Sequence, residues 1–231
     1  PYAVVDRAVE AARALDAPWA AKFVNGVLRN FLRRKQELLQ RADDFEPARF
    51  CHPQWWINRV RGAYPKQWMD ILNANNSRPP LTLRVNRLRT TPADYMAQLQ
   101  AAALEAEWLE QGAIRIIKPV AVDKLPGFRE GLVSVQDAGA QMAAALLDLA
   151  PGQRVLDACA APGGKAAHIL ETAAIELVAL DQDPLRLKQV GENFQRLQLQ
   201  GRLVAGDAAT PDAWWDGKPF QRILADVPCS A

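Results

Sequence analysis

The segment from Asp157 to Lys165 reads Asp-Ala-Cys-Ala-Ala-Pro-Gly-Gly-Lys and has the residue types of a ligand-binding loop. Arg154, Val155 and Leu156 before it favour a short strand, and the residues after it have helical periodicity. Gly163 and Gly164 allow a ligand to approach the backbone closely, and free N–H groups at a helix start favour a carboxylate or a phosphate. The segment therefore predicts a nucleotide-like cofactor site between a strand and a helix.

Two better-known glycine loops do not fit this segment. A P-loop needs a glycine five residues before the Gly-Lys pair and Ser or Thr after it, but Cys159 and Ala166 occupy those positions. The dinucleotide fingerprint needs three spaced glycines, and only an adjacent pair is present. ATP hydrolysis and NAD chemistry are therefore disfavoured. Taken alone, the loop could still be a tight turn without a ligand.

Three downstream apolar runs are predicted strands, and each is followed by an aspartate. These pairs are 176–180 with Asp181, 202–205 with Asp207, and 222–225 with Asp226. Ligands bind at the carboxyl ends of strands in open α/β sheets, and an acidic side chain roughly 20 residues after the glycine loop can reach a ribose diol. A single aspartate there is often only a helix cap or turn former. Three of them beside a glycine loop favour a cofactor site.

The motifs occur in the order and spacing of a known family. They are Asp157–Lys165, Gly206-Asp207 and Asp226-Val227-Pro228-Cys229-Ser230-Ala231, with Arg78-Pro79-Pro80, Leu83-Arg84-Val85-Asn86 and Val135-Gln136-Asp137-Ala138 upstream. Over most of its length the chain resembles the S-adenosylmethionine-dependent RNA cytosine-C5 methyltransferases, specifically their bacterial 16S rRNA branch. The resemblance implies an α/β fold with a Rossmann-like methyltransferase sheet and S-adenosyl-L-methionine as cofactor.

The resemblance also implies roles for individual residues. The cofactor would be lined by Cys159, Ala160, Ala161, Pro162, Gly163, Gly164 and Lys165. Asp181 would bind its ribose and Asp207 its adenine edge. Asp226 would lie between the methyl group and the target cytosine, as both a cofactor-binding and a catalytic residue. Ala166 stands where the family often has Thr or Ser, which removes one hydrogen bond.

Two cysteines have different roles in the resembling family. Cytosine C5 is a weak nucleophile, so a thiolate first adds to C6 and makes C5 able to attack the sulfonium methyl group. The attacking thiol belongs to a Thr-Cys motif, which we expect beyond Ala231. Cys229 would assist release of that thiol, with a small buried thiol as the alternative, and Asp226 would supply the acid near N3. For Cys159 we expect a packing role.

Composition excludes several classes of protein. The 231 residues, 49% hydrophobic and 23% charged, can bury one large or two modest cores. No uncharged apolar run approaches the roughly 18 residues of a membrane span. The start of the chain lacks an initiator Met and a signal pattern, which we interpret as the start of a fragment. The three cysteines have neither a paired nor a metal-ligand spacing, so we expect no metal, no disulfide and a cytoplasmic protein.

The charge is uneven along the chain. Residues 131–231 hold 8 of the 28 Lys and Arg and 12 of the 26 Asp and Glu, so residues 1–130 carry a net charge of +6. This favours a polyanion partner for the upstream half, although ordinary solvated charge would give the same excess. The predicted RNA-contacting residues are Arg33, Arg34, Arg78, Arg84, Arg87 and Arg89. Trp55, Trp56 and Trp68 have helical spacing, which is more typical of a core than of base stacking.

We predict three domains. Residues 1–46 are helical and resemble the end of an antitermination-factor-like RNA-binding domain. Residues 47–130 form a small α+β RNA-recognition domain, in which residues 81–86 alternate as a half-exposed strand. Residues 131–231 form the N-terminal part of the S-adenosylmethionine-binding domain, whose sheet would be completed further along the gene.

The sequence thus predicts a monomeric, cytoplasmic RNA (cytosine-5-)-methyltransferase with 16S rRNA as its substrate. Two other functions remain open. One is an S-adenosylmethionine-dependent methyltransferase of another RNA position, which needs no cysteine pair. The other is a non-catalytic RNA-binding assembly factor with a relic cofactor fold.

Overall fold

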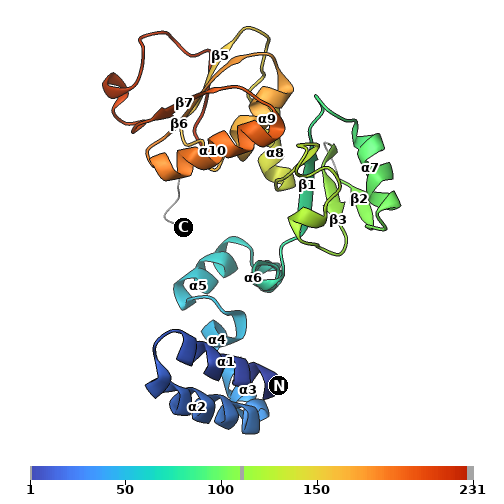
Figure 1. The fold of residues 1–231 in the computed structure, drawn as a ribbon. Coiled ribbons are helices and arrows are strands. Elements are labelled where there is room, and N and C mark those ends of the chain that lie inside the picture. The colour runs from blue at the N-terminus through green and yellow to red at the C-terminus, as the bar shows by residue number, and fades with distance from the viewer. Residues whose placement is uncertain (1, 110–111, 228–231) are drawn as a thin grey trace. The chain divides into compact units, whose positions relative to one another are not determined.

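The structure is a computed structural model that describes residues 2–109 and 112–227. It divides into two compact units, Pro1–Arg78 and Pro79–Ala231, which we call the helical unit and the sheet unit (Figure 1). No described helix is long and apolar enough to span a membrane.

The helical unit contains only helices among its described residues. They are α1 (Tyr2–Ala14), the short 3-10 helix Pro18–Ala20, α2 (Ala21–Arg33), α3 (Lys35–Asp43), α4 (Glu46–Phe50), α5 (Gln54–Ala63) and α6 (Trp68–Asn76). Phe50, Ile57, Val60 and Leu72 form its largest buried cluster, against which Trp56 and Trp68 pack. The predicted core role of these two tryptophans is confirmed, whereas Trp55 is 58% exposed.

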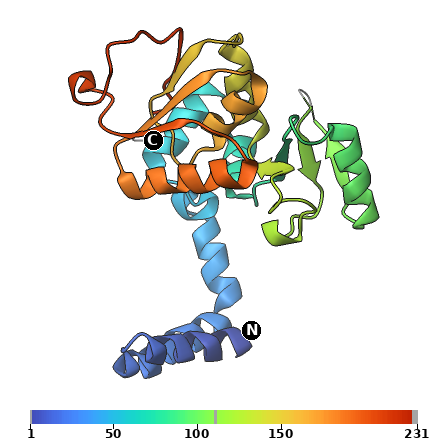
Figure 2. The same cartoon turned by 45° about the horizontal axis from the view of Figure 1, so that its top comes forward.

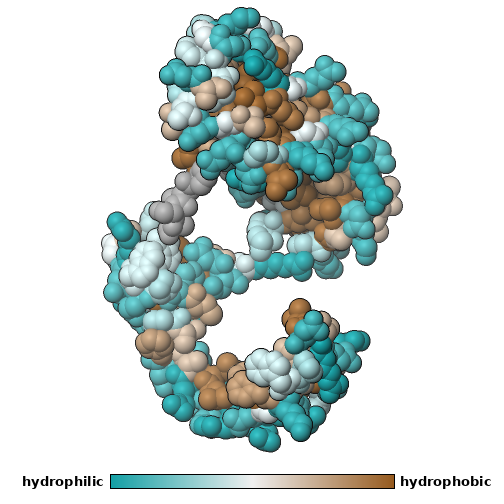
Figure 3. Space-filling model, turned by 60° about the vertical axis from the view of Figure 1, so that its left-hand side comes forward, coloured by the Kyte–Doolittle hydropathy of each residue, from teal (hydrophilic) through white to brown (hydrophobic). Residues whose placement is uncertain are grey.

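Apolar side chains also lie on the surface of the helical unit. Figure 3 shows apolar residues among its hydrophilic ones. Trp19, in the 3-10 helix before α2, is exposed, as are Phe23 and Val27 of α2. Arg33 and Arg34 are exposed as predicted, and the guanidinium of Arg34 donates to Glu37 at 2.6 and 3.0 Å. Arg33 is therefore freer than Arg34 to contact a polyanion.

The sheet unit begins with a small antiparallel sheet, which we call the small sheet. Its strands are β1 (Leu81–Val85), β2 (Ala106–Trp108), β3 (Ile114–Ile116) and β4 (Val133–Val135), in the order β2-β3-β1-β4. Helix α7 (Pro92–Ala101) packs on one face, where Leu83, Val85, Tyr95 and Leu99 are buried. The side chain of Thr91 caps α7 by accepting a hydrogen bond from the Asp94 amide at 3.1 Å.

The prediction of a half-exposed strand over residues 81–86 is wrong. β1 is buried on both faces rather than half-exposed, because α8 (Ala138–Leu146) covers the face that carries Thr82 and Arg84. β4 pairs with β1 in the small sheet, so a boundary at residues 130/131 would separate two hydrogen-bonded strands. The helices of residues 54–76 fall in the helical unit and not in the unit of the small sheet.

The second sheet of this unit is parallel, and we call it the parallel sheet. Its elements are β5 (Arg154–Asp157), α9 (Gly164–Thr172), β6 (Glu176–Asp181), α10 (Pro184–Leu197), β7 (Arg202–Ala205), the short 3-10 helix Pro211–Ala213 and β8 (Arg222–Leu224). The strand order is β7-β6-β5-β8, with all pairs parallel. This confirms the predicted α/β fold with a methyltransferase-like sheet.

The alternation of side chains along the strands builds a core on each face of the parallel sheet. Val155, Leu177 and Ala179 belong to one buried cluster with residues of α9 and α10, among them Val190 and Phe194. Figure 2 shows these two helices beside the parallel sheet. On the opposite face Leu156, Val178 and Leu180 pack against Val204, Trp214 and Phe220. The chain runs from β5 to β6 to β7 on one side and returns to β8 on the other. This reversal between β5 and β8 is the topological switch point, where ligands bind in such sheets.

Candidate cofactor site

The loop between β5 and α9 is fixed to the ends of the neighbouring strands. The Ala158 amide donates to the Leu224 carbonyl and the Ala160 amide to the Leu180 carbonyl, both at 2.9 Å. The Ala161–Pro162 peptide bond is cis. Since these bonds tie the loop to β8 and β6, the sequence from Asp157 to Lys165 is held at the switch point of the sheet.

Gly163 is required at the start of α9. Its φ of 101° is in the left-handed region, and a Cβ at this position would lie 3.1 Å from Val190 Cα. Side chains are strained in that conformation, and α10 leaves no space for one. No described side chain caps the first turn of α9. The N–H groups at this end therefore remain suited to an anionic ligand.

A cavity of about 590 Å³ opens at the carboxyl ends of the strands, next to this loop. Five predicted site residues line it, namely Cys159, Ala161, Asp181, Asp207 and Asp226. The other predicted loop residues, Ala160, Pro162, Gly163, Gly164 and Lys165, are not among the lining residues. Sequence reasoning missed Ala158, Gln182, Arg186, Gly206, Ala208, Ala209 and Val227. Gln182 could have been found, because it directly follows the strand that ends in Asp181.

Asp181 has both a structural and a cavity-lining position. Its side chain is buried, with Oδ2 accepting from the Ala161 amide and Oδ1 from the Asp183 amide, each at 3.1 Å. Arg186 Nη2 donates to the Ala161 carbonyl at 3.0 Å. Both backbone polar groups of Ala161 are thus hydrogen-bonded, the N–H by Asp181 at the end of β6 and the carbonyl by Arg186 of α10.

Lys165 and Asp226 join the loop to the end of β8. Lys165 Nζ forms an ion pair and hydrogen bond with the Asp226 carboxylate. The side chain of Asp226 remains 56% exposed and lines the cavity. Lys165 therefore holds Asp226 at the cavity without covering it.

Asp157, at the end of β5, is the most deeply buried acid of the site. It is 1% exposed, and neither carboxylate oxygen has a hydrogen-bond partner among the described residues. Burial raises the pKa of Asp157 to about 6; the nearby Cys159 amide opposes this shift, although it lies outside hydrogen-bonding geometry. Burial, followed by the charges of Asp181 and Asp157, also raises the pKa of the Cys159 thiol. Cys159 is therefore protonated at neutral pH and is a poor nucleophile, which agrees with a packing role.

Replacing Asp157 with asparagine is expected to stabilise the protein at neutral pH. Since the folded pKa is raised, the wild-type carboxyl costs folding free energy above its unfolded pKa near 4, and the cost is complete above pH 6. We expect the advantage in unfolding free energy of the Asn variant over wild type to grow by roughly 2 kcal/mol as the pH rises from 4 to 7.5. Urea unfolding at both pH values measures it, with the exposed Asp123→Asn as control. A gain that does not change with pH would contradict the assignment.

The predicted RNA-contacting arginines do not behave alike. Arg78, Arg87 and Arg89 are exposed, as a phosphate contact requires. Arg84 is wrong as an RNA contact, because its side chain is 3% exposed and paired with the equally buried Glu171. Cys229, with Pro228, Ser230 and Ala231, lies outside the described residues. No metal-binding cluster occurs among the residues described.

Comparison with known proteins places these features in a family. Residues 144–231 match the 16S rRNA methyltransferase RsmB/F family, residues 52–123 the ferredoxin-like domain of RsmF/B-like methyltransferases, and residues 1–33 the NusB family. The whole chain is 48% identical over 233 residues to ribosomal RNA small subunit methyltransferase B of Serratia proteamaculans, and 47% identical over 234 residues to that of Yersinia pseudotuberculosis. The chain thus contains NusB-like and RsmB/F methyltransferase domains. It spans 54% of the length of both relatives.

Solved structures show the same fold. A methyltransferase homolog from Pyrococcus horikoshii is 24% identical, with a TM-score of 0.70 over 80% of this chain and 62% of its own. NSun6 from the same organism, solved with SFG, is 17% identical, with a TM-score of 0.67 over 77% of this chain and 71% of its own. At these identities the similarity concerns the fold alone.

RsmB/F proteins use S-adenosyl-L-methionine, and the site described above fits this cofactor. The cavity has the size of a small-molecule site, and its acidic lining suits ribose hydroxyls and a sulfonium cation. The uncapped start of α9 suits the carboxylate of the methionine moiety.

Proposed function

We propose that this chain is part of an enzyme that transfers a methyl group from S-adenosyl-L-methionine to C5 of a cytosine in small-subunit rRNA, through a covalent cysteine–C6 intermediate. The observation that carries the proposal is one cavity lined by Asp181, Asp207 and Asp226, next to the Asp226–Cys229 string. In the sequence Asp226 is followed by Val227-Pro228-Cys229, and these residues would supply the acid and the second thiol that C5 methylation uses and that methylation of an amine or a ribose does not.

The cofactor would be held by residues from three strands. Asp181 would accept hydrogen bonds from the ribose hydroxyls, and Asp207 would contact the adenine edge. The start of α9 would receive the carboxylate. The bound cofactor supplies an electrophilic methyl group on a sulfonium.

Asp226 would act on the cytosine. Its side chain is over half exposed beside the cavity, so a base can reach it, and Lys165 restricts its position. As the thiolate adds to C6, electron density moves to N3, and Asp226 would hold the proton that N3 takes up. After C5 is methylated, the C5 proton leaves and the C6–sulfur bond breaks. Cys229 would assist this last step.

The proposed position of methylation is tested with rRNA that carries tritium at cytosine C5. Methylation at C5 must release that tritium to water, one for each methyl group transferred. Methyl transfer without tritium release would assign the enzyme to another RNA position. RNA binding with neither methyl transfer nor release, by the complete protein, would favour a non-catalytic assembly factor.

Replacing Cys229 with serine in the complete protein is expected to accumulate a covalent protein–RNA adduct. The downstream thiol can still add to C6, but its release is impaired. Denaturing electrophoresis with labelled RNA and S-adenosyl-L-methionine measures the adduct, with the exposed Cys51→Ser as the matched control. If Cys229→Ser forms no adduct while a variant without the downstream thiol does, Cys229 is the nucleophile, as in DNA cytosine methyltransferases.

A further inference from the structure

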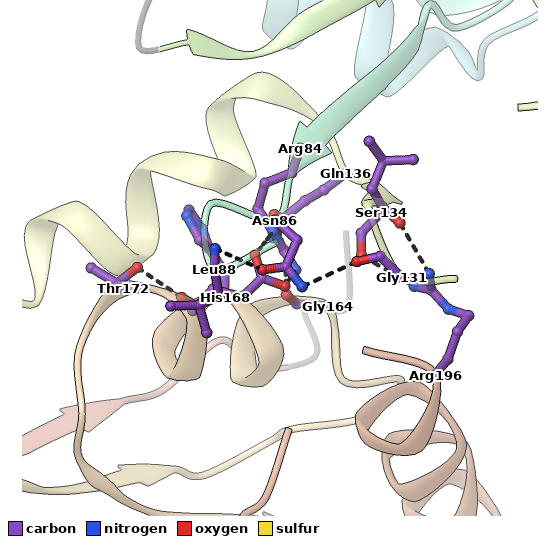
Figure 4. Close-up of polar contacts among 12 residues, drawn as sticks. Arg84, Asn86, Leu88, Gly131, Ser134, Gln136, Gly164, His168, Thr172 and Arg196 are labelled. Carbon is purple, nitrogen blue, oxygen red and sulfur yellow. Dashed lines mark hydrogen bonds and ion pairs between the residues drawn. The ribbon is translucent and has the colours of Figure 1, made fainter. Parts of the chain in front are cut away.

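The buried guanidinium of Arg84 joins the small sheet to α9, the helix that follows the loop of the candidate cofactor site (Figure 4). Arg84 Nε and Nη2 donate to the two carboxylate oxygens of Glu171 at 2.9 and 2.8 Å. Arg84 Nη1 donates to the side-chain oxygen of Gln136 at 2.6 Å and to the carbonyl oxygen of Gly164 at 2.7 Å. All three guanidinium nitrogens are thus used, and the side chains of Arg84 and Glu171 are each 3% exposed.

Both α9 residues that Arg84 contacts lie on one face of that helix. Gly164 and Glu171 are seven residues apart, or two turns, and helical side chains lean toward the N-terminus. Arg84 therefore holds α9 at two points, the carbonyl of its first residue, Gly164, and the carboxylate of Glu171. The bond to Gly164 matters most, since Gly164 is the first residue of α9 and directly follows Gly163 at the end of the loop.

The other end of this connection is equally fixed. Arg84 is in β1, which lies between β3 and β4 in the small sheet. Gln136 follows β4, and its amide donates to the Thr82 carbonyl at 3.0 Å. Gln141 of α8 donates to the carbonyls of Gln136 and Leu83 at 3.0 and 3.3 Å. A shift of β1 would therefore be passed by the guanidinium to the first turn of α9.

A second arginine links the same two sheets but does not contact the cofactor loop. Arg196 of α10 donates to the Phe128 and Val133 carbonyls at 2.7 and 3.0 Å and to Ser134 Oγ at 3.1 Å. Its guanidinium also stacks on Phe128, 4.4 Å from the ring centroid. Arg196 thus matches Arg84 as a connection between the small sheet and the helices of the parallel sheet.

We propose that Arg84 is a positioning residue for the cofactor: by holding the Gly164 carbonyl it fixes the first turn of α9 and the adjoining loop, and so sets the affinity for S-adenosyl-L-methionine. The proposal rests on the proposed function and deepens it. It makes the small sheet, with its exposed arginines, a determinant of cofactor binding as well as a candidate RNA surface.

The test compares Arg84→Lys with Arg196→Lys in the complete protein. Lysine keeps the charge opposite Glu171 but cannot make the planar set of bonds that includes Gly164. We expect the dissociation constant for S-adenosyl-L-methionine, measured by calorimetry, to rise about tenfold in Arg84→Lys and to stay within about twofold in Arg196→Lys. Hydrogen exchange should quicken in a peptide covering residues 163–168 in the first variant only.

Each other result is decisive. Equal losses of affinity in both variants, or none in either, would overturn the proposal and leave Arg84 as a structural connection. If Arg84→Lys loses its native tryptophan fluorescence, Glu171→Gln, which keeps the shape of the partner, takes its place under the same criteria. If the wild-type protein binds no S-adenosyl-L-methionine, the proposed function fails, and the exchange of residues 163–168 still decides the role of Arg84.

Discussion

Replacing Arg84 with methionine is expected to lower the free energy of unfolding of the sheet unit by about 3–5 kcal/mol, because it leaves the buried carboxylate of Glu171 without its partner. Burial raises the pKa of Glu171 above its ordinary value, and Arg84 opposes that shift. In the variant the pKa rises further, so the penalty is present above the unfolded pKa of a glutamate and shrinks as Glu171 becomes protonated at lower pH. Urea unfolding at pH 7.5 and pH 4.5 measures both effects.

The second variant of this series removes the carboxylate as well. Arg84→Met with Glu171→Leu should recover most of the lost stability, since an apolar pair of similar volume is often as stable as a buried ion pair. The exposed pair Arg7–Glu10 is the control, and its removal should have no measurable effect. A double variant that is no more stable than Arg84→Met would show that the loss comes from packing and not from the unpaired charge.

Replacing Asp181 with alanine is expected to weaken binding of S-adenosyl-L-methionine by about 1.5–3 kcal/mol, or roughly tenfold to a hundredfold. The change removes the proposed charge-assisted hydrogen bond to the ribose and the bond that Asp181 accepts from the Ala161 amide. Calorimetry on the complete protein measures the dissociation constant.

Asp183→Ala is the matched control for this variant. Asp183 lies two residues away and caps α10 by accepting from the Leu185 amide at 2.8 Å, so its loss should cost stability but leave the affinity unchanged. If Asp181→Ala binds the cofactor as tightly as wild type, the ribose contact lies elsewhere in the cavity.

The parallel sheet could be predicted from the sequence because the residues at the ends of its strands are of types that bind a ligand. Its strands are short apolar runs, and the end of each is marked by an aspartate or by the glycine loop, so the positions of Asp157, Asp181, Asp207 and Asp226 followed without any tertiary information. Arg186 of α10 was missed, because it reaches the cavity through the packing of α10 against the loop, where its side chain donates to the Ala161 carbonyl.

Arg84 shows why the rest could not be predicted. In β1 it alternates with Leu83 and Val85, which is the pattern of a strand with one face in water. That face is instead covered by α8 and α9, and the charge that compensates the arginine, Glu171, is 87 residues away. A pattern within one strand carries no information about a partner at that distance. β4 was missed for the same reason: its three residues form a strand by pairing with β1, which is distant in the sequence.

The Arg84–Glu171 pair also bears on how the sheet unit folds and unfolds. If the small sheet opened alone, the buried carboxylate of Glu171 would lose its counter-charge. If the parallel sheet opened alone, the buried guanidinium of Arg84 would lose its own. Partial opening is therefore penalised on both sides, which favours loss of the two sheets in a single cooperative transition. Although it is built from two sheets of different topology, the region from Pro79 onward should behave as one foldon.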